Sequence, residues 1–171
     1  MAFTGIKRKI VKLGVNYLFV GIKAFEIKRK LLNWIGHDIG EGTKIVGPID
    51  CTATLKVGCN CWIGKNFVAN GNGSVSIGDN CDIAPQVTFQ TGGHEVGSGA
   101  RRAGKGVRYS ISVGDGCWIC AQSTILGGVN IAEGCVVAAC ACVTKSIDKN
   151  SMVGGVPAKL IKKLEGFDWT H

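Results

Sequence analysis

Apolar residues recur at every sixth position through most of this 171-residue chain. The period begins at Ile39, slips by two residues after Val75, breaks after Phe89 and returns at Val113. A period of six fits neither an α-helix nor the alternation of one long strand, so it predicts a short strand and a corner, repeated many times. Every position in the series is apolar, and most are Val or Ile: Ile39, Ile45, Cys51, Val57, Ile63, Ala69, Val75, Ile77, Ile83, Phe89, Val113, Ile119, Ile125, Ile131, Val137 and Val143.

Small residues occupy fixed places within each hexad. The residue after the anchor is often Gly or Ala, as at Gly40, Gly64 and Gly114, and the fifth residue is often small as well. This pattern predicts a triangular solenoid in which each coil holds several hexads and branched side chains stack on their equivalents one coil away. The 26 glycines are about twice the usual usage and suit a chain with many tight corners. The predicted fold class is mainly β.

The nine cysteines find a structural explanation in this repeat. Cys61, Cys81, Cys117 and Cys135 all fall at the fifth hexad position, where a free thiol behaves as a small hydrophobe. The pairs at 59–61 and 117–120 have spacings that could suggest zinc, but adjacent hexad positions point in different directions. We therefore predict no metal site, and reduced thiols that suit a cytoplasmic protein.

Two segments depart from the repeat and one precedes it. Residues 90–112 form a long excursion, rich in glycine and arginine, and an interruption of this length is typical of a functional loop. Ala158 to Glu165 is predicted to be a short capping helix. The predicted organisation is an N-terminal amphipathic helical segment at 1–38, the solenoid at 39–156, and a C-terminal helix and tail at 157–171.

The N-terminal segment has the periodicity of a helix, although Gly14 and Gly21 weaken it. Two interpretations stay open: the helix packs on the solenoid or on a neighbouring subunit, or it lies on an anionic membrane surface, which its excess of basic residues would favour. No apolar run is long enough to cross a bilayer. The apolar seam follows alternating spacings of four and three: Ile6, Ile10, Leu13, Tyr17, Val20, Ala24, Ile27 and Leu31.

The formal net charge of +8 also has two interpretations. It can serve solubility alone, or it can attract a partner that carries phosphates or an anionic surface. Nucleic acid is not an expected partner, because no recognised binding motif accompanies the charge.

Short motifs follow one another in a fixed order between Ser76 and Lys163. In this order they resemble the hexapeptide-repeat acetyltransferases, which include galactoside and maltose O-acetyltransferases, xenobiotic acetyltransferases, and O-acetyltransferases of capsule and lipopolysaccharide assembly. The resemblance implies a left-handed parallel β-helix, a homotrimer, and acetyl-CoA as co-substrate. The motifs are Ile77-Gly78-Asp79-Asn80, Thr91-Gly92-Gly93-His94, Val113-Gly114-Asp115-Gly116-Cys117-Trp118-Ile119, Val143-Thr144-Lys145 and Gly155-Val156-Pro157-Ala158-Lys159.

His94 is the catalytic base that the resemblance implies. A hydroxyl is a weak nucleophile at neutral pH, so a base must take its proton as it attacks the thioester. Of the other histidines, His37 precedes the repeat and His171 ends the chain. Glu95 is a candidate to orient the imidazole or to contact the substrate. The family transfers the acetyl group directly, so no cysteine is expected to be a nucleophile.

The resemblance also places acetyl-CoA in a groove between two solenoids. Trp118 would pack against the pantetheine arm, although plain packing is the alternative, and the backbone at Ala121 and Ala139 would bind its amides. By the same resemblance the residues expected near the 3′-phosphate are Thr144, Lys145, Lys159 and Lys162. Lysine suits a phosphate as a compact charge.

The predicted reaction is O-acetylation of a sugar or polysaccharide-precursor hydroxyl. Asn72, and less closely Asn70, resemble a segment that holds the sugar in the galactoside enzyme. Cys120 and the triplet Ala139-Cys140-Ala141 depart from the family pattern, and the arginine-rich half of the excursion has no counterpart.

Other functions stay open beside this one. An aminosugar N-acetyltransferase or an antibiotic acetyltransferase would use the same solenoid, and a noncatalytic scaffold would need no base. A γ-type carbonic anhydrase would need three histidines that converge on zinc, which the positions of His37, His94 and His171 do not favour. The expected location is the cytoplasm, at the inner face of the membrane if the N-terminal helix binds lipid.

Overall fold

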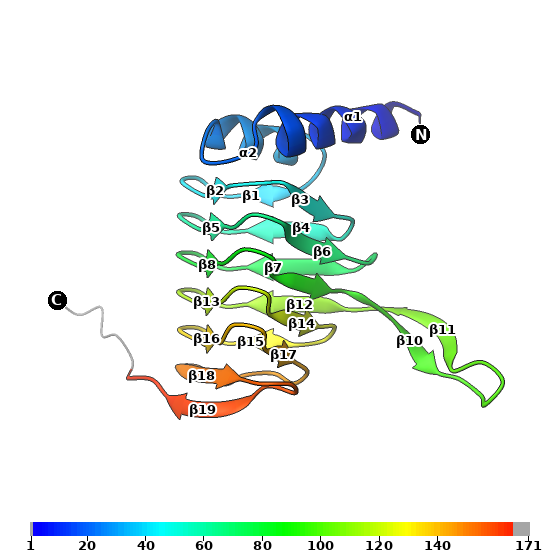
Figure 1. Ribbon diagram of the computed structural model, residues 1–171. Coiled ribbons are helices and arrows are strands. Elements are labelled where there is room, and N and C mark those ends of the chain that lie inside the picture. Colours follow the sequence, from blue (N-terminus) through cyan, green and yellow to red (C-terminus); the bar gives the residue numbers. More distant parts are fainter. Residues whose placement is uncertain (1, 166–171) are drawn as a thin grey trace.

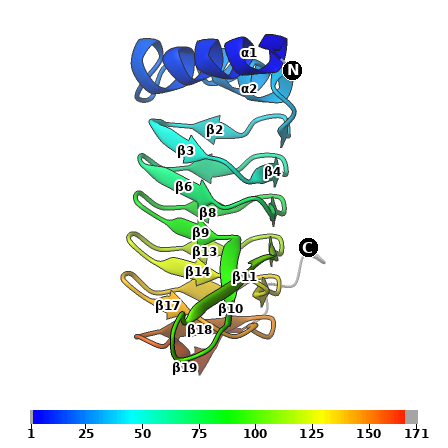
Figure 2. The same cartoon turned by 90° about the vertical axis from the view of Figure 1, so that its right-hand side faces the viewer.

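The computed structural model describes residues 2–165 and shows a solenoid of stacked coils with two helices across one end (Figure 1). Each complete coil contributes one short strand to each of three sheets, which form the faces of the solenoid. The same stacking order is visible from the side (Figure 2). The predicted mainly β solenoid is confirmed.

The strands within each face are parallel and come from successive coils, except for the last strand of the second face. The first face holds β1 (Asp38–Ile39), β4 (Thr54–Val57), β7 (Ser74–Ile77), β12 (Ser110–Val113) and β15 (Asn130–Ile131). The second holds β2 (Lys44–Ile45), β5 (Trp62–Ile63), β8 (Asp82–Ile83), β13 (Trp118–Ile119), β16 (Val136–Val137), β18 (Ser151–Gly154) and β19 (Lys159–Lys163). The third holds β3 (Ile49–Cys51), β6 (Phe67–Asn70), β9 (Thr88–Gln90), β14 (Thr124–Leu126) and β17 (Cys142–Val143).

The hexad anchors form the core of this solenoid. All of them are buried except Cys51, which is partly exposed. Strand pairing puts each anchor beside its equivalent one coil away, so that Ile63 lies beside Ile83 and Ile119 beside Val137. The two-residue slip falls at 71–73, in the corner between the third and first faces.

The fifth hexad position forms a buried ladder of hydrogen-bond donors. The thiols of Cys61, Cys81 and Cys117 each donate to a backbone carbonyl of the next coil, at 3.1 Å in every case. Thr43 makes the same bond with its hydroxyl at 2.6 Å. These cysteines are free and buried. Their side chains are small enough for the position and can still donate a hydrogen bond there.

The N-terminal segment forms two helices, so the expectation of one continuous helix is wrong. α1 (Ala2–Leu13) runs into a π-helical turn, η1 (Gly14–Leu18), and α2 (Phe25–Trp34) follows after a reversal. Gly21 at φ 94° and Ala24 at φ 52° adopt left-handed backbone conformations, which a helix cannot contain.

The predicted apolar seam is not the face by which α1 contacts the solenoid. Val11 and the following Val15 are buried against the solenoid. The seam residues Ile6, Ile10 and Leu13 are at least half exposed, at 58%, 50% and 53%. The helix is therefore apolar on two sides, and only one of them is covered in this chain.

Polar side chains attach the two helices to the first coil. The amide of Asn16 pairs with the backbone of Ile49 at 2.8 and 2.9 Å, and Asn33 pairs with Ile39 in the same way. Lys28 is fully buried and donates to the carbonyls of Gly21 and Val46 at 2.7 and 3.1 Å. Burial lowers the pKa of this ammonium.

The C-terminal capping helix was wrongly predicted, because residues 159–163 form strand β19. β19 pairs antiparallel with β18 after a turn at Gly155, where φ is 94°. β18 would otherwise present an open sheet edge, and pairing satisfies its backbone groups. The end of the predicted tail, including His171, lies outside the described residues.

Candidate active site

The candidate active site is built on the corner between the third and first faces, which we call the hairpin corner (residues 71–73, 91–109 and 127–129 in successive coils). The buried hydroxyl of Thr91 ties two of these turns together, because it accepts from the Gly73 amide at 3.1 Å and donates to the Asn70 carbonyl at 2.8 Å. The turn that carries Asn72 is thereby held directly beside the start of the excursion.

The excursion folds as a β-hairpin of β10 (Gly92–Val96) and β11 (Ala103–Arg108) that projects from the side of the solenoid (Figure 1). The Tyr109 amide closes its base by donating to the Thr91 carbonyl at 2.7 Å. The Tyr109 ring covers Gly127, where an added Cβ would collide with the ring. The hairpin is thus anchored at its base by both backbone and side chain.

His94 lies on β10 opposite Gly106 of β11. Its Nδ1 is 2.9 Å from the carbonyl oxygen of Gly104. A carbonyl can only accept, so Nδ1 must carry the proton in this contact. The neutral ring then has its lone pair on Nε2, which is the form that a general base needs.

A cavity of about 460 Å³ adjoins His94 at the foot of the hairpin. Asn72 lines it from the neighbouring coil, so two of the residues predicted from the sequence come together here. Asn70 contributes its backbone carbonyl to Thr91 and does not line the cavity. The other lining residues come from the hairpin itself: Gly92, Gly93, Gly106, Val107 and Arg108.

Glu95 follows His94 on the strand and does not line the cavity. The group that orients the imidazole is the Gly104 carbonyl, not the carboxylate considered from the sequence. Gly104 was missed because its role depends on the hairpin register. The cluster Gly97-Ser98-Gly99 was the available signal, since such residues mark a hairpin turn.

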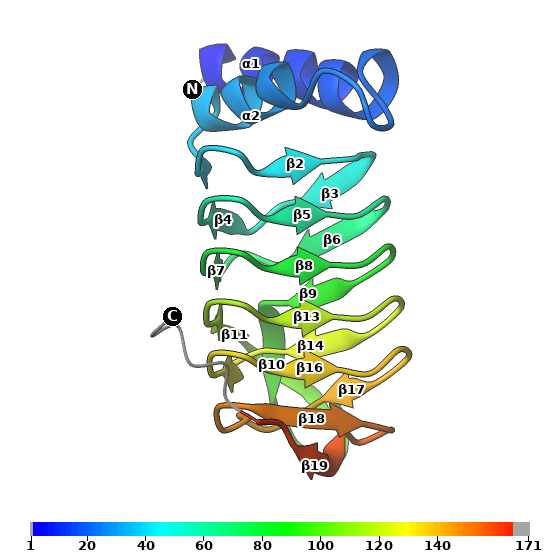
Figure 3. The same cartoon turned by 90° about the vertical axis from the view of Figure 1, so that its left-hand side faces the viewer.

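The residues predicted to bind coenzyme A lie elsewhere on the chain. Trp118 is on β13 of the second face with 54% of its surface exposed, and Lys159 and Lys162 are on β19 of the same face. That face looks toward the viewer in Figure 3, with the hairpin behind it. Within one chain, His94 and Trp118 are therefore on opposite sides of the solenoid.

The other predicted coenzyme residues lie at corners. Ala121 and Ala139 occupy equivalent turns of neighbouring coils, between the second and third faces, and the Cys140 amide donates to the Ala121 carbonyl at 3.0 Å. Thr144 and Lys145 are exposed just after β17. One chain does not gather these residues into a single pocket with His94.

Neither metal binding nor a membrane-spanning helix is supported by the described part of the chain. No three His, Cys, Asp or Glu side chains of residues 2–165 are grouped to hold a metal ion, and His37 and His94 line separate cavities. No helix in this range is long and apolar enough to cross a bilayer.

Similar proteins share this architecture. A family model described as bacterial transferase hexapeptide (six repeats) matches residues 110–145. The galactoside O-acetyltransferase of Escherichia coli K12 is 33% identical over 149 residues, which are 84% of this chain and 71% of that protein. A putative acetyltransferase of Saccharomyces cerevisiae is 38% identical over 119 residues, 66% of this chain and 61% of that protein.

Solved structures agree with these sequence matches. A hexapeptide-repeat acetyltransferase of Vibrio cholerae O1 biovar eltor, complexed with acetyl coenzyme A, has a TM-score of 0.81 at 25% identity and covers 96% of this chain and 89% of that one. A galactoside acetyltransferase in complex with coenzyme A has a TM-score of 0.81 at 27% identity, with 95% and 82% covered.

The solenoid with its projecting β10–β11 hairpin, together with these matches, defines an acyltransferase of the hexapeptide class. The chain belongs to the hexapeptide-repeat acetyltransferase family, as the sequence motifs predicted.

Proposed function

We propose that this protein transfers an acetyl group from acetyl-CoA to a hydroxyl of a sugar or polysaccharide precursor, with Nε2 of His94 as the general base. The observation that carries this proposal is the contact between His94 Nδ1 and the Gly104 carbonyl at 2.9 Å. It fixes the tautomer and leaves Nε2 free to accept a proton beside the cavity.

The reaction requires one proton acceptor and no covalent enzyme intermediate. Nε2 takes the hydroxyl proton while the hydroxyl oxygen attacks the thioester carbonyl. The tetrahedral intermediate then collapses, the carbon–sulfur bond breaks, and the imidazolium returns its proton to the leaving thiolate. The products are the acetyl ester and free coenzyme A.

The cavity is suited to a carbohydrate acceptor, and the name of one relative points to the same class of acceptor. The volume of about 460 Å³ is within the range of small-molecule sites. Asn72 offers an amide, with both donors and an acceptor, beside His94. The galactoside O-acetyltransferase of Escherichia coli, by its name, acts on a sugar derivative.

The test of this chemistry is the release of coenzyme A thiol with a panel of sugars and aminosugars. His94→Gln is expected to lower turnover by about 10²–10⁴-fold, the usual contribution of a general base. Glu95→Gln is the matched control and should retain turnover, because Glu95 does not line the cavity. Full activity of His94→Gln would refute the mechanism, and exclusive use of amine acceptors would replace the O-transfer with N-transfer.

We further infer that the complete site forms between copies of this chain in a homotrimer, with acetyl-CoA lying between Trp118 of one copy and His94 of another. The support is geometric, since the two residues lie on opposite sides of one chain (Figures 1 and 3). A ring of identical heterologous contacts would bring the hairpin of each copy to the second face of the next.

Subunit mixing tests the shared site. His94→Ala and Trp118→Ala chains, each with low turnover alone, should regain part of the wild-type turnover when unfolded together and refolded, because some mixed sites then hold both native residues. Mixing two batches of His94→Ala is the control. If mixing restores no turnover although the copies assemble, each chain carries its own complete site.

We also propose that the exposed side of α1 contacts an anionic membrane surface. Ile6, Ile10, Leu13 and Tyr17 form an uncovered apolar stripe, and Lys9 and Lys12 flank it. Apolar side chains between lysines match the boundary between acyl chains and anionic head groups.

Vesicle sedimentation distinguishes a membrane contact of this stripe from a contact with a second copy of the chain. Ile10→Asn should weaken binding to phosphatidylglycerol vesicles, whereas Leu160→Asn, at a similarly exposed site on β19, should not. Absence of binding to such vesicles, together with a change of oligomeric state in Ile10→Asn, would assign the stripe to a subunit contact.

A further inference from the structure

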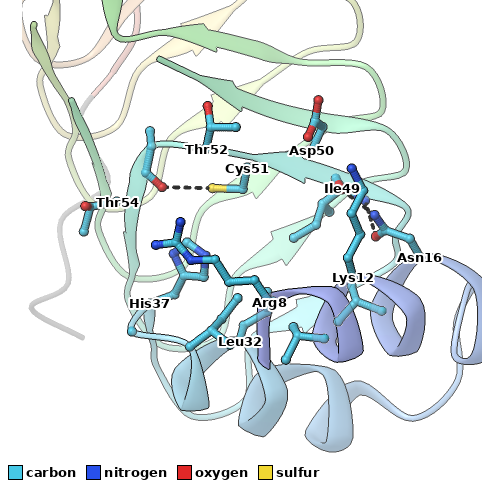
Figure 4. Close-up of a pocket in the computed structure, with 15 residues that line it drawn as sticks. Arg8, Lys12, Asn16, Leu32, His37, Ile49, Asp50, Cys51, Thr52 and Thr54 are labelled. Carbon is cyan, nitrogen blue, oxygen red and sulfur yellow. Dashed lines mark hydrogen bonds between the residues drawn. The ribbon is translucent and has the colours of Figure 1, made fainter. Parts of the chain in front are cut away.

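A second cavity, of about 290 Å³, lies between the two helices and the first coil, apart from the His94 cavity. Its walls come from α1, from α2 with the turn that follows it, and from residues 49–54 of the solenoid (Figure 4). The proposed acetyl transfer uses none of its residues.

One part of this cavity is cationic. Arg8 and Lys12 are one helical turn apart on α1 and both line it. Within residues 2–165 neither of them forms an ion pair with a carboxylate. Asp50 is the only acidic residue of the lining, against these two basic side chains.

His37 adds a directed donor beside Arg8 (Figure 4). Its Nδ1 accepts a hydrogen bond from the Leu55 amide at 3.3 Å, so the proton of the neutral ring is on Nε2. Burial, and secondarily the charge of Arg8, lower the pKa of His37, which keeps the ring neutral. The Nε2–H of His37 and the guanidinium of Arg8 are therefore neighbouring donors, and the lining supplies no acceptor that both of them share.

The rest of the cavity is apolar. Val11 of α1, Val15 of η1 and Leu32 of α2 are buried, and Ile35 and Ala53 complete that side. Two polar side chains of the lining are already bonded, since Asn16 pairs with the Ile49 backbone and Thr52 with Gly71. A ligand that suits the cavity must therefore combine an anionic group with an apolar body.

We propose that this cavity binds a small amphiphile with an anionic head group, a carboxylate or a phosphate. The head group lies between Arg8 and the Nε2–H of His37, with Lys12 as a second cation further along the lining, and the apolar part lies against Val11 and Leu32 (Figure 4). A charge-assisted contact with a guanidinium is stronger than a neutral hydrogen bond, so the head group contributes much of the affinity.

Titration of the full-length protein with four probes tests the proposal: decanoate, decyl phosphate, decanol and inorganic phosphate, each below its micellar concentration and followed by calorimetry. Decanoate or decyl phosphate should bind at least about tenfold more tightly than decanol and than inorganic phosphate. The stronger of the two identifies the head group. The proposal would be overturned if neither decanoate nor decyl phosphate binds more tightly than decanol, or if none of the probes binds.

Variants locate the bound probe. Arg8→Gln should weaken binding on the order of tenfold, whereas Lys9→Gln, on the same helix but outside the lining, should not. In His37→Asn the side-chain amide can still accept from the Leu55 amide, but it is too short to place an N–H where Nε2 of His37 lies, so it should also weaken binding. Equal affinity of Arg8→Gln and Lys9→Gln for the probes would place them elsewhere.

Nuclear magnetic resonance of the histidine side chains gives a second readout. The charged groups that line the cavity around His37 are Arg8 and Lys12 from α1 and Asp50 from β3. A bound anion offsets the two cations, so the pKa of His37 should rise when the probe binds. His94→Gln should bind the probe normally, which keeps this outcome separate from that of the proposed acetyl transfer.

Discussion

Ile119 on the wall of the solenoid has no exposed surface, whereas every residue of β10 except Gly93 is exposed. On the wall, apolar anchors stack coil upon coil, and even the thiols at the fifth hexad position find carbonyl partners. The hairpin buries little, and its one histidine uses a backbone carbonyl to fix its tautomer. Stability is thus concentrated in the wall and the candidate chemistry in the hairpin, so the two should respond separately to substitution.

The largest difference is expected for apolar truncations. Ile119→Ala should lower the free energy of unfolding by about 2–5 kcal/mol, because it leaves a cavity among fully buried anchors. Val96→Ala, at a hairpin position that is 87% exposed, should change it by less than about 0.5 kcal/mol. Urea denaturation of both variants checks this. Similar losses of unfolding free energy at the two sites would mean that the hairpin packs against a surface that does not belong to the same chain.

Two glycines test the same comparison between wall and hairpin, with a smaller expected change in the free energy of unfolding. A Cβ at Gly64 would lie 2.6 Å from the Pro85 nitrogen and 2.7 Å from the Ala84 carbonyl carbon, both backbone atoms of the next coil. Gly64→Ala should therefore push two coils apart and cost about 1–3 kcal/mol. Nothing lies within 4 Å of a Cβ at Gly106 in the hairpin, so Gly106→Ala should unfold like the wild type in the same denaturation assay. A neutral Gly64→Ala would show that the coils are less tightly stacked than these distances imply.

The same division explains what could be predicted from the sequence. The hexad anchors were recognisable because each coil repeats the same local requirement, so a single pattern reports the whole wall. β19 was mistaken for a helix, since its basic, apolar sequence suits either form and its pairing with β18 is a tertiary contact. The exposed stripe of α1 shows the same limit, because periodicity reveals a seam without showing what covers it.

The site was predictable in part for the same reason. His94 and Asn72 were found by motif, and both line the cavity at the hairpin corner. The Gly104 carbonyl could not be found in this way, because it meets His94 only through the antiparallel register of the hairpin. The separation of Trp118 from His94 likewise depends on which face each strand occupies.

Alkaline pH should weaken the wall through the partly buried thiol of Cys51. Burial raises the pKa of Cys51 to about 12 from its ordinary value of 9.0. Above pH 9 the unfolded chain ionises this thiol while the folded chain keeps it protonated, so the free energy of unfolding should fall as pH rises toward 12. Denaturation between pH 8 and 10 should show a shallower fall for Cys51→Ala than for the wild type. Cys140→Ala, which removes an exposed thiol, is the control, and an equal slope in both variants would contradict the assignment.

The smallest effect on overall stability is expected where wall and hairpin meet. The Tyr109 ring covers Gly127 of the wall and lies near Gly93 of the hairpin, so it holds the two together without belonging to the buried core. Tyr109→Leu should change the global free energy of unfolding by less than about 1 kcal/mol, yet it should let the hairpin open more often. Limited trypsin digestion at Arg101, Arg102 and Lys105 should then be roughly tenfold faster, which corresponds to ~1.4 kcal/mol of local opening. Tyr17→Leu, at the other tyrosine of the chain, should leave the cleavage rate unchanged. If Tyr109→Leu also leaves it unchanged, the backbone bond between Tyr109 and Thr91 is sufficient to hold the hairpin in place.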